Sequence, residues 1–189
     1  VNTLSNLPAV QASTVIVKPV HRAFVTGAGP SLETQIAELR KIRDTGFLIA
    51  SDTSLPALLS YGLRRDVGIS IDCQLVSYHH FLQGLPDEVP LLLDLASPPV
   101  LTRLTKRGVF FTSSHPLSLY LSRHWRPLPF IDTSGGNVSH AAVSLAEYLG
   151  AREIYLLGVD FSYPEGKAYC RGTDRKSTRL NSSHVSISY

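Results

Sequence analysis

The sequence predicts an α/β protein with a doubly wound, mainly parallel sheet and helices on both faces. Short apolar runs alternate along the chain with stretches of helical spacing. These runs are apolar throughout, which is typical of strands that are covered on both faces and therefore of parallel sheets. Small and polar residues follow directly after the runs, at the sheet edge where open α/β sheets bind their ligands.

The order of the expected elements is that of a Rossmann-like sheet. Strands are predicted at 22–26, 47–50, 67–71, 90–95, 109–112 and 153–159. Helices are predicted at 31–44, 53–61, 78–82, 99–105, 116–125 and 137–149. The helix at 137–149 has the clearest pattern, with Val138, Ala141, Leu145 and Leu149 along one face. Gly150 is a suitable C-terminal stop for it.

The composition indicates one globular domain. Of the 189 residues, 43% are hydrophobic and 17% charged, which argues against disorder. No apolar run approaches the roughly 20 residues that span a bilayer, and no signal peptide is recognisable. The two cysteines, Cys73 and Cys170, form neither a disulfide framework nor a metal motif. We therefore expect a cytoplasmic protein that has no membrane partner.

Three segments are expected along the chain. Residues 1–21 show no apolar period, and the sequence starts at Val1 and contains no Met, so we interpret them as a lead-in from an upstream region. Residues 22–173 form the domain, which we expect to be incomplete at its C-terminus. Residues 174–189 match a translated sequencing adapter, without a mismatch from Asp174 to His184, and we exclude them from fold reasoning.

The net charge of +3 is no sign of a nucleic-acid partner. Residues 174–189 hold three basic residues and one acidic residue, a contribution of +2, so the rest of the chain carries only +1. A net charge so close to zero is weak evidence for binding to a phosphate backbone, and no nucleic-acid partner is expected.

Two glycine-rich turns are the first candidate site. In GAGPSLE, Gly27 and Gly29 permit a tight turn, and Pro30 and Ser31 begin a helix whose free N–H groups suit a phosphate. In TSGGNVSH, at 133–140, a second turn opens a helix at Gly135, Gly136 and Asn137. The alternative is a pair of tight turns without a ligand, with Asn137 as a helix cap. Two such turns at one sheet edge favour a nucleotide-sized ligand.

Three aspartates are the second candidate site. Asp52, Asp72 and Asp160 each follow a strand. Each suits binding of a ribose, holding of Mg²⁺, or the role of a base, and each also suits the capping of a turn. Their shared position favours a catalytic function for at least one, with the role unassigned. No metal site is predicted, because no ligand set has a convincing spacing.

Three stretches together carry a family resemblance. GAGPSLE at 27–33, SDTSLPALLSYGLRRDVGISIDCQ at 51–74 and GGNVSHAAVSLAEYLGAREIYLLGVDFSY at 135–163 resemble the 6-hydroxymethylpterin diphosphokinase MptE-like domain. That domain is shared by archaeal pterin pyrophosphokinases and by bacterial motility-associated factor (Maf) glycosyltransferases. The resemblance covers 22–173 and implies a Rossmann-like transferase.

The two branches of the family imply different reactions. The Maf branch implies transfer of a nonulosonic acid from a CMP-activated donor to Ser or Thr of flagellin. The archaeal branch implies transfer of pyrophosphate from ATP, with Mg²⁺, to a hydroxymethylpterin. By resemblance, Gly27, Gly29, Pro30 and Ser31 hold nucleotide phosphate. The other residues of the cleft are then Asp52, Asp72, Gly135, Gly136, Asn137 and Asp160.

The lead-in favours one branch. NTLSNLPAV at 2–10 resembles the segment that joins an upstream domain to this one in Maf proteins. We therefore prefer the glycosyltransferase, with the diphosphokinase as the alternative and a nucleotide-binding module without catalysis as a third hypothesis. No cofactor is expected except Mg²⁺ in the diphosphokinase case.

Overall fold

A six-stranded sheet forms the centre of the molecule. The computed structural model describes residues 2–12, 19–81, 89–105 and 107–173. The strands are β1 (Arg22–Thr26), β2 (Phe47–Ser51), β3 (Val67–Ser70), β4 (Leu91–Asp94), β5 (Gly108–Phe111) and β6 (Glu153–Leu157). All neighbouring strands pair in parallel. Each predicted strand is therefore confirmed, with ends that differ by no more than two residues.

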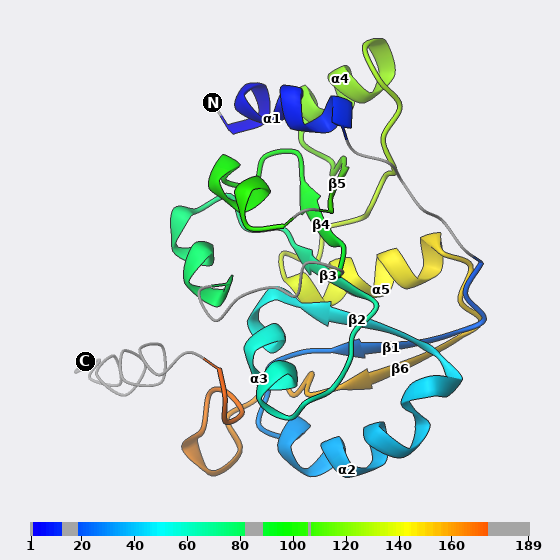
Figure 1. Ribbon diagram of the computed structural model, residues 1–189, viewed down its shortest axis with the longest axis vertical. Helices are drawn as coiled ribbons and strands as arrows, with labels where there is room; N and C mark the ends of the chain where they lie inside the picture. Colours follow the sequence, from blue (N-terminus) through cyan, green and yellow to red (C-terminus); the bar gives the residue numbers. More distant parts are fainter. Residues whose placement is uncertain (1, 13–18, 82–88, 106, 174–189) are drawn as a thin grey trace.

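The strand order creates one crevice. The order is β5-β4-β3-β2-β1-β6, which Figure 1 shows from top to bottom. The chain moves outward from β1 to β5 and then crosses back to place β6 on the other side of β1. Since β2 lies on one side of β1 and β6 lies on the other, the β1–β6 boundary is the topological switch point, where doubly wound sheets bind ligands.

Helices cover both faces of the sheet, as predicted. The α-helices are α1 (Asn2–Ala12), α2 (Leu32–Ile42), α3 (Leu55–Ser60), α4 (Pro116–His124) and α5 (Val138–Tyr148). One core cluster joins buried residues of α1, α2 and α3 to the sheet, among them Leu32 and Phe24. The other cluster joins α5 to the opposite face, through residues such as Ala142 and Val25. Successive side chains of each strand point alternately to the two clusters. Since both faces of the strands are buried in this way, the strand sequences are apolar throughout.

Several predicted helices are shorter and tighter than expected. Short 3₁₀ segments are η1 (Arg43–Thr45), η2 (Asp52–Ser54), η3 (Leu75–Phe81), η4 (Pro99–Arg103) and η5 (Pro164–Gly166). The stretches predicted as helices at 78–82 and 99–105 are thus 3₁₀ turns in their described parts, and residue 82 lies outside the described residues. Apolar spacing alone does not separate one 3₁₀ turn from the start of an α-helix.

Helix α1 was not predicted from the sequence. Its buried face is largely polar, with Thr3 and Asn6 beside Val10, so no apolar period marks it. The Asn6 amide donates to Leu95 O (3.0 Å) and to Ser97 O (2.8 Å) and thereby holds α1 on the loop after β4. The lead-in at 1–21 therefore includes a helix that packs on the domain. The segment 174–189 lies outside the described residues.

Candidate functional site

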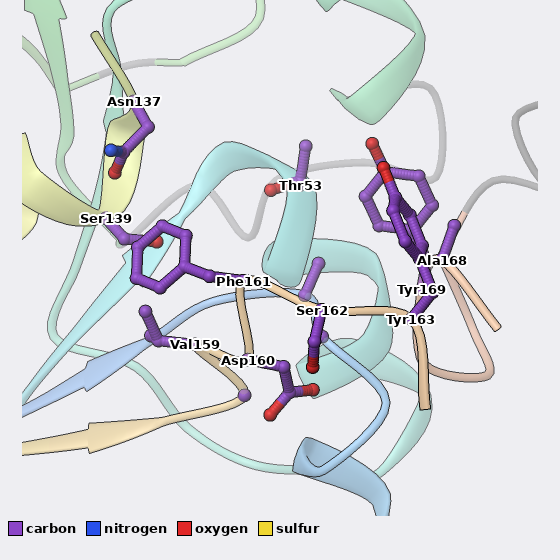
Figure 2. A pocket seen from close by; sticks show the side chains of 13 residues that line it. Thr53, Asn137, Ser139, Val159, Asp160, Phe161, Ser162, Tyr163, Ala168 and Tyr169 are labelled. Atoms are coloured by element: carbon purple, nitrogen blue, oxygen red, sulfur yellow. The ribbon is translucent and has the colours of Figure 1, made fainter. Parts of the chain in front are cut away.

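A pocket of about 470 Å³ lies at the switch point, beyond the carboxyl ends of β1 and β6. Figure 2 shows it from close by. Its walls come from the first glycine turn, the start of α5 and the loop after β6. The lining residues are Ala28, Gly29, Thr53, Asn137, Ser139, Gly158, Val159, Asp160, Phe161, Ser162, Tyr163, Ala168 and Tyr169. Its volume is in the range of small-molecule sites.

The first glycine turn packs directly against the loop that follows β6. Gly27 N donates to Leu157 O (2.8 Å) and Gly29 N donates to Gly158 O (2.7 Å). A Cβ on Gly27 would overlap Gly158 O, and a Cβ on Gly29 would lie 2.8 Å from the same oxygen. The glycines therefore let two backbones meet, and two of the amides expected for a phosphate are already bonded.

An acidic side chain holds the start of α2. Ser31 N donates to Asp160 Oδ2 (2.9 Å), so the carboxylate lies where an anion binds a helix N-terminus. Asp160 thus links the pocket to α2. The prediction that Gly27, Gly29, Pro30 and Ser31 hold phosphate stays a prediction. In this conformation a phosphate at the α2 terminus would have to displace the Asp160 carboxylate.

The second glycine turn shapes the start of α5. Gly136 has φ of 68°, a conformation that favours glycine, and a Cβ on Gly135 would lie 2.6 Å from the His140 ring. Asn137 is the N-cap, and its Oδ1 accepts a hydrogen bond from His140 N (2.8 Å). Asn137 also lines the pocket, so the capping role and the predicted binding role are compatible.

Replacing Asn137 with alanine is expected to lower the free energy of unfolding by about 1 kcal/mol, because the N–H of His140 loses its acceptor. Asn137→Ser is the control, since a serine oxygen can take the same role. Urea titration of the three proteins measures the effect. Equal stability of the alanine and asparagine proteins would contradict the importance of this cap.

Asp52 is buried behind the pocket instead of lining it. The residue is only 4% exposed. Its carboxylate accepts hydrogen bonds from Thr53 N (2.7 Å) and from the Ser70 hydroxyl (2.7 Å). Burial raises the pKa of the Asp52 carboxyl above its usual value, although the Ser70 hydrogen bond opposes this shift. Thr53, which does line the pocket, is thereby fixed by Asp52.

The raised pKa of Asp52 makes stability depend on pH. A carboxyl whose pKa is higher in the folded state contributes fully to stability below its unfolded pKa of about 4, and this contribution disappears as pH rises through the folded pKa. Asp52→Asn removes the titration. We therefore expect the variant to gain stability relative to the unmodified protein between pH 4 and pH 7.5 in urea unfolding. A difference that does not change with pH would contradict the raised pKa.

Two further strand-end aspartates are not among the residues that line the pocket. Asp72 accepts a hydrogen bond from Gln74 N (2.8 Å) and thus stabilises a turn. Asp94, at the end of β4, is buried and accepts from Ala96 N (2.7 Å), and burial raises the pKa of its carboxyl. Neither lines the pocket. The catalytic prediction for Asp72 stays untested, and the geometry assigns it a turn.

The loop after β6 forms the outer wall of the pocket. Phe161 and Tyr163 are 79% and 73% exposed. The end of the loop is held to the first glycine turn, since Cys170 N donates to Ala28 O (2.8 Å) and Arg171 N donates to Glu33 Oε1 (2.7 Å). Burial raises the pKa of the Cys170 thiol to about 12, so it stays protonated and is no nucleophile at neutral pH.

Three predicted site residues meet in the pocket: Gly29, Asn137 and Asp160. Gly27, Ser31 and Gly135 support the turns around it. The sequence analysis missed Phe161, Ser139 and Tyr169 as lining residues, because they are neither glycines nor carboxylates. Phe161 could have been predicted to line the pocket from its position directly after Asp160, a strand-end aspartate.

The described part of the chain has no helix with the length and hydropathy of a membrane span. Nor do its described residues include three or more His, Cys, Asp or Glu side chains grouped as for a metal ion.

A family model described as 6-hydroxymethylpterin diphosphokinase MptE-like matches residues 1–166. The chain belongs to the MptE-like family. The match includes α1 and the first part of the loop after β6, up to residue 166, and it confirms the resemblance seen in the sequence.

Relatives of this MptE-like chain include uncharacterised proteins of Treponema pallidum (strain Nichols). One is 41% identical over 98 residues, which are 50% of this chain and 35% of that protein. Another is 28% identical over 170 residues, which are 84% of this chain and 30% of that protein. The chain thus spans about a third of the length of these curated relatives.

A solved structure shares the fold. The Maf glycosyltransferase from Magnetospirillum magneticum AMB-1 superposes with a TM-score of 0.67 over 78% of this chain and 24% of that chain. The two are 23% identical, so the likeness establishes a common α/β fold.

Proposed function

We propose that this MptE-like chain is the nucleotide-binding part of a Maf-like transferase. In the proposed reaction a nonulosonic acid moves from a CMP-activated donor to a Ser or Thr hydroxyl of flagellin. Support at the level of the family comes from the matching family model and from the fold shared with a Maf glycosyltransferase. The donor and acceptor rest on the resemblance of the sequence to the Maf branch.

One observation carries the proposal: the pocket combines polar side chains with exposed aromatic rings. Asp160 and Asn137 supply groups for the polar parts of a nucleotide. Phe161 and Tyr163 supply planar surfaces that are exposed at its mouth. A nucleotide has the matching pattern, with a polar sugar phosphate and a flat base.

The second candidate is a diphosphokinase that transfers pyrophosphate from ATP to a hydroxymethylpterin. The description of the matching family model favours it. That reaction uses Mg²⁺ to neutralise phosphate charge. Of the strand-end aspartates Asp52, Asp72, Asp94 and Asp160, only Asp160 lines this pocket, so Asp160 is the carboxylate that would hold the ion.

Calorimetry with two ligands separates the candidates. We expect the protein to bind CMP more tightly than ATP with Mg²⁺, because the proposed donor carries a cytidine monophosphate group. Tighter binding of ATP with Mg²⁺ would instead support the diphosphokinase. Nucleotide binding without transfer to flagellin or to a pterin would indicate a binding module, and the absence of binding to either nucleotide would contradict the proposal.

A further inference from the structure

We infer that Phe161 is the residue on which the planar base of the ligand stacks in the pocket. The inference rests on the proposed function, since it requires a nucleotide in this pocket. It adds a specificity-determining residue, which the sequence analysis did not identify.

The backbone of Phe161 is the first observation. Its φ is 47°, and it is the sole non-glycine residue with a positive φ in the described part of the chain. A bulky residue in this region is a true outlier, because its Cβ crowds the neighbouring backbone. Such conformations persist where the surroundings hold them, and they concentrate at ligand sites.

The neighbours of Phe161 hold it in place. Asp160, the preceding residue, is fixed by the hydrogen bond from Ser31 N (2.9 Å). Gly158, two residues further back, has φ of 63° and is held by Gln35 Oε1, which accepts a hydrogen bond from Gly158 N (2.9 Å). The chain therefore leaves β6 along a fixed path that turns the Phe161 side chain outward.

The exposure of the ring is the second observation. At 79% exposed, it has the largest exposed fraction of the large hydrophobic residues in the described part of the chain. Burial of the ring in the protein thus does not compensate for the strained backbone. An exposed aromatic ring at a pocket mouth is a surface on which a planar ligand can pack.

The side chains around the ring fit a base. Figure 2 shows the Phe161 ring on the side of the pocket where Asn137 and Ser139 lie, with Tyr163 and Tyr169 on the other side. Asn137 and Ser139 carry an amide and a hydroxyl, which can donate to and accept from the edge of a base stacked on Phe161. Asp160 lies between the two sides, where its carboxylate can accept a hydrogen bond from a ribose hydroxyl.

The test compares CMP with ribose 5-phosphate, which has no base. We expect Phe161→Ala to weaken CMP binding about tenfold to a hundredfold, since base stacking on an aromatic side chain typically contributes that much. Ribose 5-phosphate should bind the variant and the unmodified protein equally. Phe161→Tyr keeps an aromatic ring and should bind CMP within about twofold of the unmodified protein.

Two controls separate stacking from folding. Phe161→Gly removes the ring and also the backbone strain, so it should melt no lower than the alanine variant and still bind CMP weakly. Tyr148→Ala removes an exposed ring at the far end of α5 and should leave CMP binding unchanged.

The outcomes separate this inference from the proposed function. Tight CMP binding by both Phe161→Ala and Phe161→Gly would overturn the stacking role and leave the nucleotide site standing. If the unmodified protein binds neither CMP nor ATP, the proposed function fails, and the stacking role fails with it.

Discussion

Replacing Gly27 with alanine is expected to lower the free energy of unfolding by about 1–3 kcal/mol, the usual range for overpacking. The new Cβ would overlap Gly158 O, a backbone atom that cannot rotate away. To make room, the glycine turn and the loop after β6 must separate. The separation strains the hydrogen bonds of Gly27 N to Leu157 O and of Gly29 N to Gly158 O, which close the switch point. Urea unfolding measures the loss.

Gly108→Ala is the matched control for Gly27→Ala. Gly108 also lies at a strand end, at the start of β5, but a Cβ there would meet only Thr105 Cγ2, at 3.6 Å. We expect its stability to stay within about 0.5 kcal/mol of the unmodified protein. If both variants lose the same stability, the loss comes from replacing a glycine at any such position. The close approach of the two loops would then not explain it.

The sheet was predictable because strands that are buried on both faces are short apolar runs in the sequence. Runs such as FLIA at 47–50 have few polar residues, and each of them forms a strand of the parallel sheet. The strand order was not predictable, since apolar runs carry no information on which run pairs with which. The crossover that places β6 beside β1 therefore emerged only from the structure, and it decides where the pocket lies.

The features that the sequence did not reveal depend on contacts between residues that are far apart along the chain. Helix α1 is held by amide hydrogen bonds from Asn6 to carbonyl oxygens far along the chain, and such contacts have no local pattern. The conformation of Phe161 depends on the contact of Asp160 with Ser31 N, across the switch point. The glycines of GAGPSLE were correctly placed at a sheet edge. Their close partner, the backbone of the loop after β6, was not predictable from spacing.

Asp160 joins two roles that the sequence analysis treated as separate. Its carboxylate accepts from Ser31 N and so belongs to the first glycine turn. It also lines the pocket together with Asn137 from the second turn. The fold thus brings an acidic group into the lining of the pocket and holds it there by the hydrogen bond from Ser31 N, and a carboxylate held in this way suits the movement of a proton.

On the proposed function, Asp160→Asn is expected to lower the transfer rate by roughly 10²–10⁴-fold, the range for loss of a positioned general base. The asparagine Oδ1 can still accept the hydrogen bond from Ser31 N, so the start of α2 should stay intact. A rate assay with donor and acceptor, together with a thermal unfolding curve, separates the lost charge from lost structure. We expect a melting temperature close to that of the unmodified protein.

Asp72→Asn is the matched control for Asp160→Asn, because both replace a strand-end carboxylate with an amide. Asp72 holds the turn at Gln74 and does not line the pocket, so its transfer rate should stay within about threefold of the unmodified protein. The reverse result, a silent Asp160 and an essential Asp72, would move the reaction from the β1–β6 crevice to the end of β3. Equal loss in both variants would show that the carboxylates act together across the sheet edge, against the single-site assignment made from the pocket.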